Sequence, residues 1–305
     1  MTLQKTIVPK IDMHVHPHFP GGPERLRGGT WPAPEEVRST YERLNIEKGV
    51  IMSCYAPEHM HDPITSRDAE SMFQRYPETF AGWFCAIDPR MCTNSPQSNL
   101  SYYLDFFRER GAVGAGELQA NMYIDDPRML NLLSHCEKCN MPVTIHFGKP
   151  GGVCGVADDL GLPRLEKVLA SFPKLRILGH AMAFWSELSA DVTSETREQY
   201  PCGPVIPEGR LPMLLRKYPN LLCDISAGSG LNALTRDPEY TFRFIEEFYE
   251  RIYFATDISS PQTIGQTAVK LCAFLDQGYQ DGNISLTAYR AICRENALAL
   301  LNNHK

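Results

Sequence analysis

Two histidines near the N-terminus, His14 and His16, are spaced so that both side chains can bind one metal ion. They lie in the stretch Lys10–His18, where apolar and polar residues alternate. This alternation predicts a β-strand, whose successive side chains point to opposite faces. The two histidines would then share a face at the end of the strand, because Pro17 has no N–H to donate to a ladder. By itself the pattern is equally compatible with a turn that two histidines line.

Further potential ligands close four other apolar segments. These segments are 111–118, 141–147, 175–180 and 252–257, and the residues at their ends are Glu117, His146, His180 and Asp257. A structural histidine has little reason to recur at such positions. Four histidines, one glutamate and one aspartate form a donor set suited to Zn²⁺, Mn²⁺ or Fe²⁺. We therefore predict a divalent metal site, with Zn²⁺ as the first choice, held by His14, His16, Glu117, His146, His180 and Asp257.

The elements that must position these residues alternate along the chain. Apolar segments at 10–16, 48–54, 79–87, 111–118, 141–147, 175–180, 220–225 and 252–257 alternate with amphipathic segments that predict helices. Eight such repeats indicate a closed (β/α)8 barrel of the α/β class, with the strands buried on both faces. All strand C-termini of such a barrel meet at one rim, so the six residues would converge there. We predict one distorted barrel domain over residues 1–305.

The order of these motifs resembles the amidohydrolase superfamily of metal-dependent barrel enzymes. The resemblance rests on His14-x-His16, on the strand-ending His146 and His180, and on the sequence Ala-Thr-Asp257. Several segments are similar to the branch that contains aminocarboxymuconate-semialdehyde decarboxylase: Pro142-Val-Thr-Ile-His146, Tyr218-Pro-Asn-Leu-Leu-Cys-Asp224 and Glu295-Asn-Ala-Leu-Ala-Leu-Leu301. The resemblance spans nearly the whole chain and implies a (β/α)8 barrel, a divalent metal and, usually, hydrolysis.

The same resemblance implies roles for individual residues. Three histidines match metal ligands: His14, His16 and His146. Asp257 matches the carboxylate that contacts the metal-bound water as general base. His180 matches a histidine that binds a second metal in some branches and is catalytic in others. Glu117 departs from the decarboxylase-like pattern and matches a metal-bridging glutamate of the TatD-type branch, which leaves sites with one or two ions open.

This constellation predicts hydrolysis of a small-molecule amide, lactone or ester. A bound metal supplies hydroxide near neutral pH, Asp257 takes the proton, and His180 donates to the developing oxyanion. The alternative is non-oxidative decarboxylation of a small carboxylic acid, with Arg25 or Arg27 gripping the carboxylate unless both are merely solvated. A TatD-like nuclease, which Glu117 favours, and a non-catalytic binding barrel are the remaining alternatives.

Other residues near the predicted rim have two interpretations each. Asp224 ends the seventh predicted strand, where it can orient a ligand histidine or cap a turn. Tyr123 and Trp185 follow the fourth and sixth predicted strands and can line a substrate pocket or merely cover the barrel. His18 can support the metal ligands from behind or lie at the solvated rim, and the rim is the preferred interpretation.

The composition limits the classes of partner. The formal net charge is −6 and no block of Lys and Arg occurs, so we expect no nucleic-acid partner. No apolar run reaches the length of a membrane span, and the N-terminus lacks an apolar signal core. We therefore expect a cytoplasmic enzyme with a small-molecule substrate, and the resemblance implies that a homodimer can form. The ten cysteines are scattered through apolar runs, which favours buried thiols over disulfides, including Cys136 and Cys139 within a helical pattern.

Overall fold

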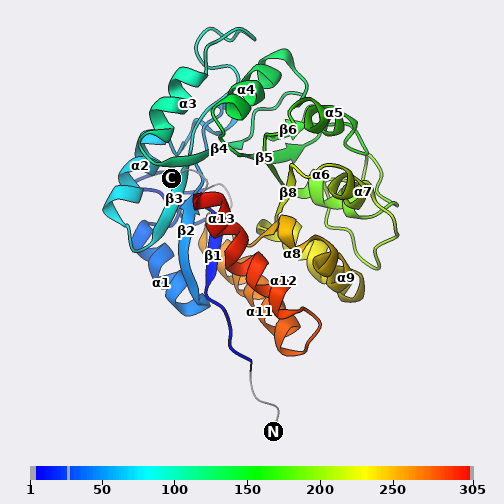
Figure 1. Ribbon diagram of the computed structural model, residues 1–305. Helices are drawn as coiled ribbons and strands as arrows, with labels where there is room; N and C mark the ends of the chain where they lie inside the picture. Colours follow the sequence, from blue (N-terminus) through cyan, green and yellow to red (C-terminus); the bar gives the residue numbers. More distant parts are fainter. Residues whose placement is uncertain (1–4, 26–27, 303–305) are drawn as a thin grey trace.

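The computed structural model describes residues 5–25 and 28–302. Eight parallel strands follow one another around a ring in the order β1-β2-β3-β4-β5-β7-β8-β9 (Figure 1). Their bounds are β1 Lys10–Val15, β2 Ile46–Ile51, β3 Phe80–Cys85, β4 Ala112–Leu118, β5 Val143–Gly148, β7 Ile177–His180, β8 Leu221–Asp224 and β9 Ile252–Tyr253. The predicted (β/α)8 barrel is therefore confirmed. A short strand absent from the prediction, β6 (Val156–Ala157), pairs with the end of β5.

The ring closes where the chain segment after β9 meets β1. The backbone N–H of Asp257 donates to the carbonyl of His14 at 2.8 Å, and the N–H of His16 donates to the carbonyl of Ile258 at 3.0 Å. These two bonds place the first histidines of the chain beside its last predicted ligand. The position of Asp257 relative to His14 is thus fixed by the backbone of the barrel.

Most helices surround the ring and cover the outer face of its strands, whereas α13 lies across the ring beside β1 and packs against the inner layer (Figure 1). Their bounds are α1 Pro34–Leu44, α2 Ser66–Arg75, α3 Ser101–Arg108, α4 Pro127–Lys138, α5 Pro163–Ser171, α6 Met182–Trp185, α7 Arg210–Lys217, α8 Ala227–Thr235, α9 Pro238–Phe248, α10 Pro261–Thr263, α11 Val269–Gln280, α12 Leu286–Arg290 and α13 Asn296–Asn302. A π-helical turn, Ile264–Ala268, joins α10 to α11, so that the chain is helical from Pro261 to Gln280. Helix α8 was not predicted.

Several helices begin at residues that satisfy free backbone N–H groups. The Thr65 side chain accepts from the N–H of Asp68 at 3.2 Å, and the Asp68 carboxylate accepts from the N–H of Thr65 at 3.1 Å, which is a capping box. Asp126 accepts from the N–H of Arg128 at the start of α4. Such caps fix where each helix starts after the loop that follows a strand.

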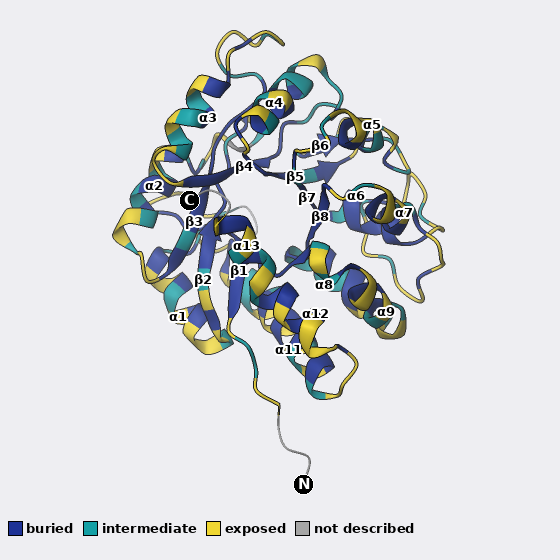
Figure 2. Ribbon diagram, viewed as in Figure 1, coloured by how far each residue is buried: buried dark blue, intermediate teal, exposed yellow. Residues whose placement is uncertain are grey.

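The core has two layers, and almost every strand residue is buried (Figure 2). The outer layer lies between strands and helices. The inner layer fills the ring and contains residues of seven strands or strand ends together with α13: Ile11, Met13, Val50, Met52, Phe84, Val113, Leu178, Leu222, Tyr253, Ala255, Ala297, Leu300 and Leu301. Strand β4 contains small residues, and at Gly114 the ring of Phe84 occupies the space of a side chain. A Cβ on Gly114 would lie 2.5 Å from that ring.

Two further predictions can be compared with the fold. All ten cysteines are free, and Cys136 is buried within α4, as predicted from the apolar runs. None of the helices that the structure describes has the length and apolar character needed to cross a bilayer.

Candidate metal centre and active site

The structure brings all six predicted ligands to the C-terminal rim of the barrel. Potential ligand atoms approach within 4.8 Å of one another in three overlapping groups, which are His14–His180–Asp224, His14–His16–Asp257 and Glu117–His146–His180. The residues come from β1, β4, β5, β7, β8 and the segment after β9. The convergence predicted for strand ends is therefore present, and Asp224 joins it.

His14 of β1 and His16, which directly follows this strand, face each other through their Nε2 atoms. The Nδ1 atom of His14 lies 2.6 Å from Oδ2 of Asp224, and Nδ1 of His16 lies 2.9 Å from the carbonyl oxygen of Met52. A carbonyl or an ionised carboxylate only accepts, so each Nδ1 carries a proton. Nevertheless the two Nε2 atoms are 2.9 Å apart. In neutral rings these would be two opposed lone pairs, an arrangement that either a proton or a metal ion between them relieves. The donor set thus fits a metal ion.

Glu117 lies between two pairs of histidines. Its Oε1 is 2.7 Å from Nδ1 of His146 and 3.7 Å from Nε2 of His180. Its Oε2 is 3.5 Å from Nε2 of His14 and 3.4 Å from Nε2 of His16. Each oxygen therefore faces one pair, which is a placement suited to a carboxylate that contacts one ion or bridges two.

Glu117 is itself held in place by polar neighbours. The side-chain amide of Gln119 donates to its Oε2 at 2.7 Å, and the thiol of Cys54 donates to the amide oxygen of Gln119 at 3.0 Å. Burial raises the pKa of the Cys54 thiol well above its usual range, so it remains a donor. This chain of hydrogen bonds fixes the orientation of the carboxylate.

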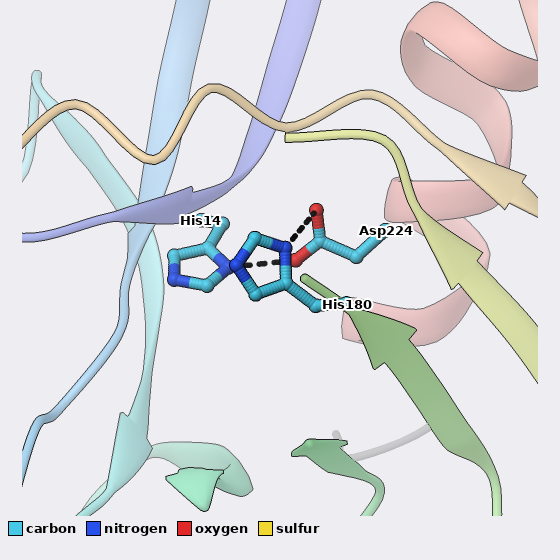
Figure 3. A group of neighbouring side chains, drawn as sticks. All are labelled: His14, His180 and Asp224. Atoms are coloured by element: carbon cyan, nitrogen blue, oxygen red, sulfur yellow. Dashed lines mark hydrogen bonds and ion pairs between the residues drawn. The ribbon is translucent and has the colours of Figure 1, made fainter. Parts of the chain in front are cut away.

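Asp224 connects His14 with His180, as Figure 3 shows. Its Oδ2 accepts from Nδ1 of His14, and its Oδ1 lies 3.8 Å from Nδ1 of His180 and accepts the N–H of Ser226 at 2.9 Å. The hydroxyl of Ser226 is also 3.0 Å from Nδ1 of His180. Both interpretations left open by the sequence therefore hold, because Asp224 orients a histidine and caps the turn after β8.

Burial and charge set the protonation of the centre. Burial disfavours the charged form of Glu117, but His146 and His14 outweigh it and hold its pKa well below the usual range. The pKa of His14 is raised because Asp224 and Glu117 outweigh the cost of burial. Burial lowers the pKa of His180, which therefore stays neutral. These shifts favour a positive charge on His14 next to the ionised carboxylate of Glu117.

Asp12, which the sequence reasoning did not single out, supports the junction between β1 and the segment after β9, where the ring closes. Its carboxylate is buried and accepts from the backbone N–H groups of His14 and Thr256 at 3.0 and 2.9 Å. It also accepts from the hydroxyls of Tyr41 and Thr256 at 2.7 and 2.5 Å. Burial raises the pKa of Asp12 to about 6. The signal was the acid two residues before the first histidine of His-x-His.

Asp257 is the member of the cluster that also faces a cavity. Its Oδ1 lies 3.4 Å from Nε2 of His16 and its Oδ2 lies 4.0 Å from Nε2 of His180, while its side chain keeps 22% of its surface exposed. Its backbone is in the left-handed region, with φ of 54°, which is uncommon outside glycine but tolerated by aspartate. The same carboxylate lines a cavity of about 790 Å³.

The cavity lies between α8 and the helical run that starts with α10. Besides Asp257 it is lined by Arg25 and Tyr200 and by one face of each helix. The guanidinium of Arg25 lies 4.1 Å from the centre of the Trp31 ring and donates to the carbonyl of Ser259. The structure thus places Arg25 in the wall of the same cavity as Asp257, whereas Arg27 lies outside the described residues.

The remaining candidates do not line this cavity. Trp31 stacks on His18 at 4.3 Å between ring centres. Tyr123 is covered by the guanidinium of Arg164, 4.0 Å from its ring centre. Trp185 is buried and donates from Nε1 to the carbonyl of Asp224 at 3.0 Å, so it supports the end of β8.

The lining residues of the helices were missed by the sequence reasoning. The helical spacing of Gln262, Gln266 and Lys270, four residues apart, was the available signal. Polar residues at this spacing usually form a solvated helix face, so the spacing alone does not indicate a binding site.

Comparisons with known proteins show the fold. No protein-family model matches the chain, and no curated protein matches its sequence. A zinc-bound amidohydrolase from Burkholderia multivorans is similar over 96% of this chain and 99% of its own, with a TM-score of 0.61 and 12% identity. A probable 2-pyrone-4,6-dicarboxylic acid hydrolase from Acinetobacter baumannii is similar over 97% and 100%, with a TM-score of 0.58 and 12% identity.

A 2,6-dihydroxybenzoate decarboxylase from Rhizobium is also similar, over 98% of this chain and 100% of its own, with a TM-score of 0.56 and 15% identity. The barrel that the resemblance implied is therefore shared with solved amidohydrolase-type structures. At such low identity the likeness concerns the fold, while the chemistry has to be argued from the residues of this chain.

Proposed function

We propose that this chain is a metal-dependent hydrolase of the amidohydrolase type that cleaves an amide, lactone or ester bond of a small molecule. The position of Asp257 carries the proposal, since its carboxylate belongs both to the histidine cluster and to the wall of the cavity. A substrate that enters the cavity would meet a potential base directly beside the potential metal ligands. The similar hydrolase structures support the proposal through their shared barrel.

The metal ligands would be His14, His16, Glu117, His146 and His180, with Asp257 completing the set. When bound, a divalent ion polarises a carbonyl and lowers the pKa of a water molecule to near neutrality. We propose Zn²⁺, which accepts imidazole and carboxylate together, and the two faces of Glu117 allow one ion or two. Asp224 would orient His14, and its Oδ1 near Nδ1 of His180 favours a proton on that nitrogen, which leaves Nε2 of His180 for the metal.

Asp257 would act as general base. Its side chain is partly exposed, so it can accept a proton from water and pass it to a leaving group within the cavity. The backbone bond from its N–H to His14 holds it in place throughout. Gln119 and Cys54 keep Glu117 oriented, and they have no need to exchange a proton with the substrate.

Non-oxidative decarboxylation is the second candidate, and the position of Arg25 favours it. Arg25 lines the cavity together with Asp257, where a guanidinium can bind a carboxylate in two hydrogen bonds. The similarity to a decarboxylase structure supports the same idea. In this case Asp257 would carry the proton that replaces the departing CO₂.

The test uses the metal-loaded protein and a panel of small amides, lactones, esters and carboxylic acids, with supercoiled plasmid for the nuclease alternative. New carboxylate, released CO₂ and nicked DNA separate the three activities. We expect new carboxylate, and we expect Asp257→Asn to reduce turnover by about 10²- to 10⁴-fold. Asp281→Asn, a matched change at an exposed position, should have no effect. Turnover of Asp257→Asn near that of the unmodified chain, at equal metal content, would contradict the assignment.

A further inference from the structure

The cavity beside Asp257 is a groove between two helical faces. One wall consists of residues of α8 spaced by about one turn, namely Gly228, Leu231, Asn232 and Thr235. The other wall is the run from α10 through the π-helical turn into α11, which presents Gln262, Gln266 and Lys270. A helix rises about 1.5 Å per residue, so this wall extends about 12 Å from Gln262 to Lys270.

The walls of the groove carry several uncharged polar side chains and a carboxylate. Hydroxyl and amide side chains line the walls, including Thr263, Thr267 and Asn232, and they can accept and donate hydrogen bonds without carrying charge. Asp257 is the one carboxylate among the lining residues that the structure describes. Such walls can form hydrogen bonds with polar groups along an extended ligand.

Lys270 supplies a positive charge at the far end of the groove. It is exposed, and within residues 5–25 and 28–302 it has no hydrogen bond or ion pair to another side chain. Lys217 of α7, by contrast, pairs with Glu166 at 2.8 Å. An ammonium group that faces a groove without a protein partner is available to an anionic group of a ligand.

Tyr200 covers part of the groove, and a glycine makes room for it. A Cβ on Gly228 would lie 2.8 Å from the hydroxyl oxygen of Tyr200, so a larger residue at this position would displace the ring. Tyr200 therefore narrows the groove over the α8 wall. A ligand would lie lengthwise beneath it, with one end at Asp257 and the other toward Lys270.

We propose that Lys270 is a specificity-determining residue that binds an anionic group of the substrate, remote from the bond that reacts. The substrate class is an extended, polar molecule with a cleavable carbonyl at one end and a carboxylate or comparable anion at the other. The assignment of the reacting end rests on the proposed function. The anion site at Lys270 rests on the groove alone and can be tested without turnover.

The test measures binding of dicarboxylates to the zinc-loaded protein by titration calorimetry, in a series from succinate to sebacate. One carboxylate can bind at the metal and Arg25, and the second reaches Lys270 only when the chain is long enough. We expect one chain length to bind about tenfold more tightly than the monocarboxylate with the same number of carbons, as one charge-assisted hydrogen bond allows.

Lys270→Gln should abolish this tenfold advantage and leave the affinity for the monocarboxylate unchanged, while Lys270→Arg should retain it. Lys167→Gln, a matched change at an exposed position of α5, should behave like the unmodified chain. A dicarboxylate advantage that survives in Lys270→Gln, or that is missing in the unmodified chain, would overturn the proposal. Because the readout is binding, failure of the hydrolysis assay would leave this result interpretable on its own.

Discussion

Two buried clusters of ionisable residues lie at opposite ends of β1 and balance their charge in different ways. At the N-terminal end, Lys10 is fully buried and its ammonium lies 2.6 Å from Oδ1 of Asp276, which also accepts from the hydroxyl of Tyr289 at 2.6 Å. At the C-terminal end, Glu117 and Asp224 pair with histidines. The cation of the first cluster, called here the lower cluster, is the side chain of Lys10. The second, called the upper cluster, depends on a proton or a metal ion for its positive charge.

This difference shows which buried charges are structural and which are available for chemistry. The chain itself supplies both the ammonium of Lys10 and the carboxylate of Asp276, so the lower pair is complete without a ligand. Imidazoles are neutral ligands when deprotonated and cations when protonated, so the upper cluster can exchange a proton for a metal. The same strand thus carries a structural ion pair and a candidate metal centre.

The largest expected effect concerns the lower cluster. Asp276→Asn leaves the ammonium of Lys10 buried without its anionic partner, so we expect the free energy of unfolding to fall by about 3–5 kcal/mol. Lys10→Met should cost less, because Asp276 keeps 27% of its side-chain surface in contact with water. Urea denaturation of both variants measures the two losses. Equal losses would indicate that Lys10 is hydrated in solution.

The next effect concerns the upper cluster, which depends on a proton or a metal ion for its positive charge. Adding Zn²⁺ at 100 times its dissociation constant should stabilise the unmodified chain by about 2.7 kcal/mol. Asp276→Asn should show the same increment, because the lower cluster is independent of the metal. His16→Asn should show little of it. Thermal unfolding with and without zinc gives the three values, and an unchanged increment in His16→Asn would argue against the metal centre.

Another buried carboxylate, Asp158, tests whether histidines lower the pKa values of Glu117 and Asp224. Asp158 accepts from the N–H groups of Arg164 and Leu165, yet burial raises its pKa to about 6, whereas His14 and His180 overcome burial at Asp224 and lower its pKa. The folded state then binds more protons than the unfolded state between about pH 4 and 6.

The stability that comes from a protonated Asp158 is therefore present below about pH 4 and is lost as the pH rises through about 6. Relative to Asp158→Asn, the unmodified chain should lose about 2 kcal/mol of unfolding free energy between pH 4 and pH 7. Chemical denaturation at a series of pH values measures this slope. A pH-independent difference between the two proteins would show that Asp158 is ionised throughout.

The smallest effect is that of the residue that orients His14. Asp224→Asn retains the shape but loses the negative charge at Nδ1 of His14, so we expect metal affinity to fall by about 10- to 100-fold. Competition with a chromogenic chelator measures it. Asp191→Asn, at an exposed position outside the cluster, serves as control. An unchanged affinity would mean that the backbone of β1 suffices to hold the ring of His14.

The strand ends could be predicted from the sequence because a parallel barrel forces residues such as His146 and His180 onto one rim. The apolar runs that precede them are a strong signal, and the helices that separate those runs have caps such as Thr65. The six candidate ligands were found in this way. Whether they bind a metal remains a prediction.

The groove and the supporting contacts could not be predicted, because they depend on distances that a pattern does not encode. Helix α8 has a low polarity contrast and contains two glycines, Gly228 and Gly230, so it resembled a loop. The pairing of Asp224 with His14 depends on strand register, and that of Asp12 with Thr256 depends on how the ring closes. The place of Lys270 in a groove depends on the opposite wall, which α8 forms.

The seam between β1 and the segment after β9 has a consequence for biosynthesis. His14 is synthesised long before Asp257, whose N–H donates to the carbonyl of His14. The first two histidines therefore exist in the nascent chain before the segment that lies beside them in the folded barrel. The proposed metal centre, like the closed ring, can be completed only after Asp257 has left the ribosome.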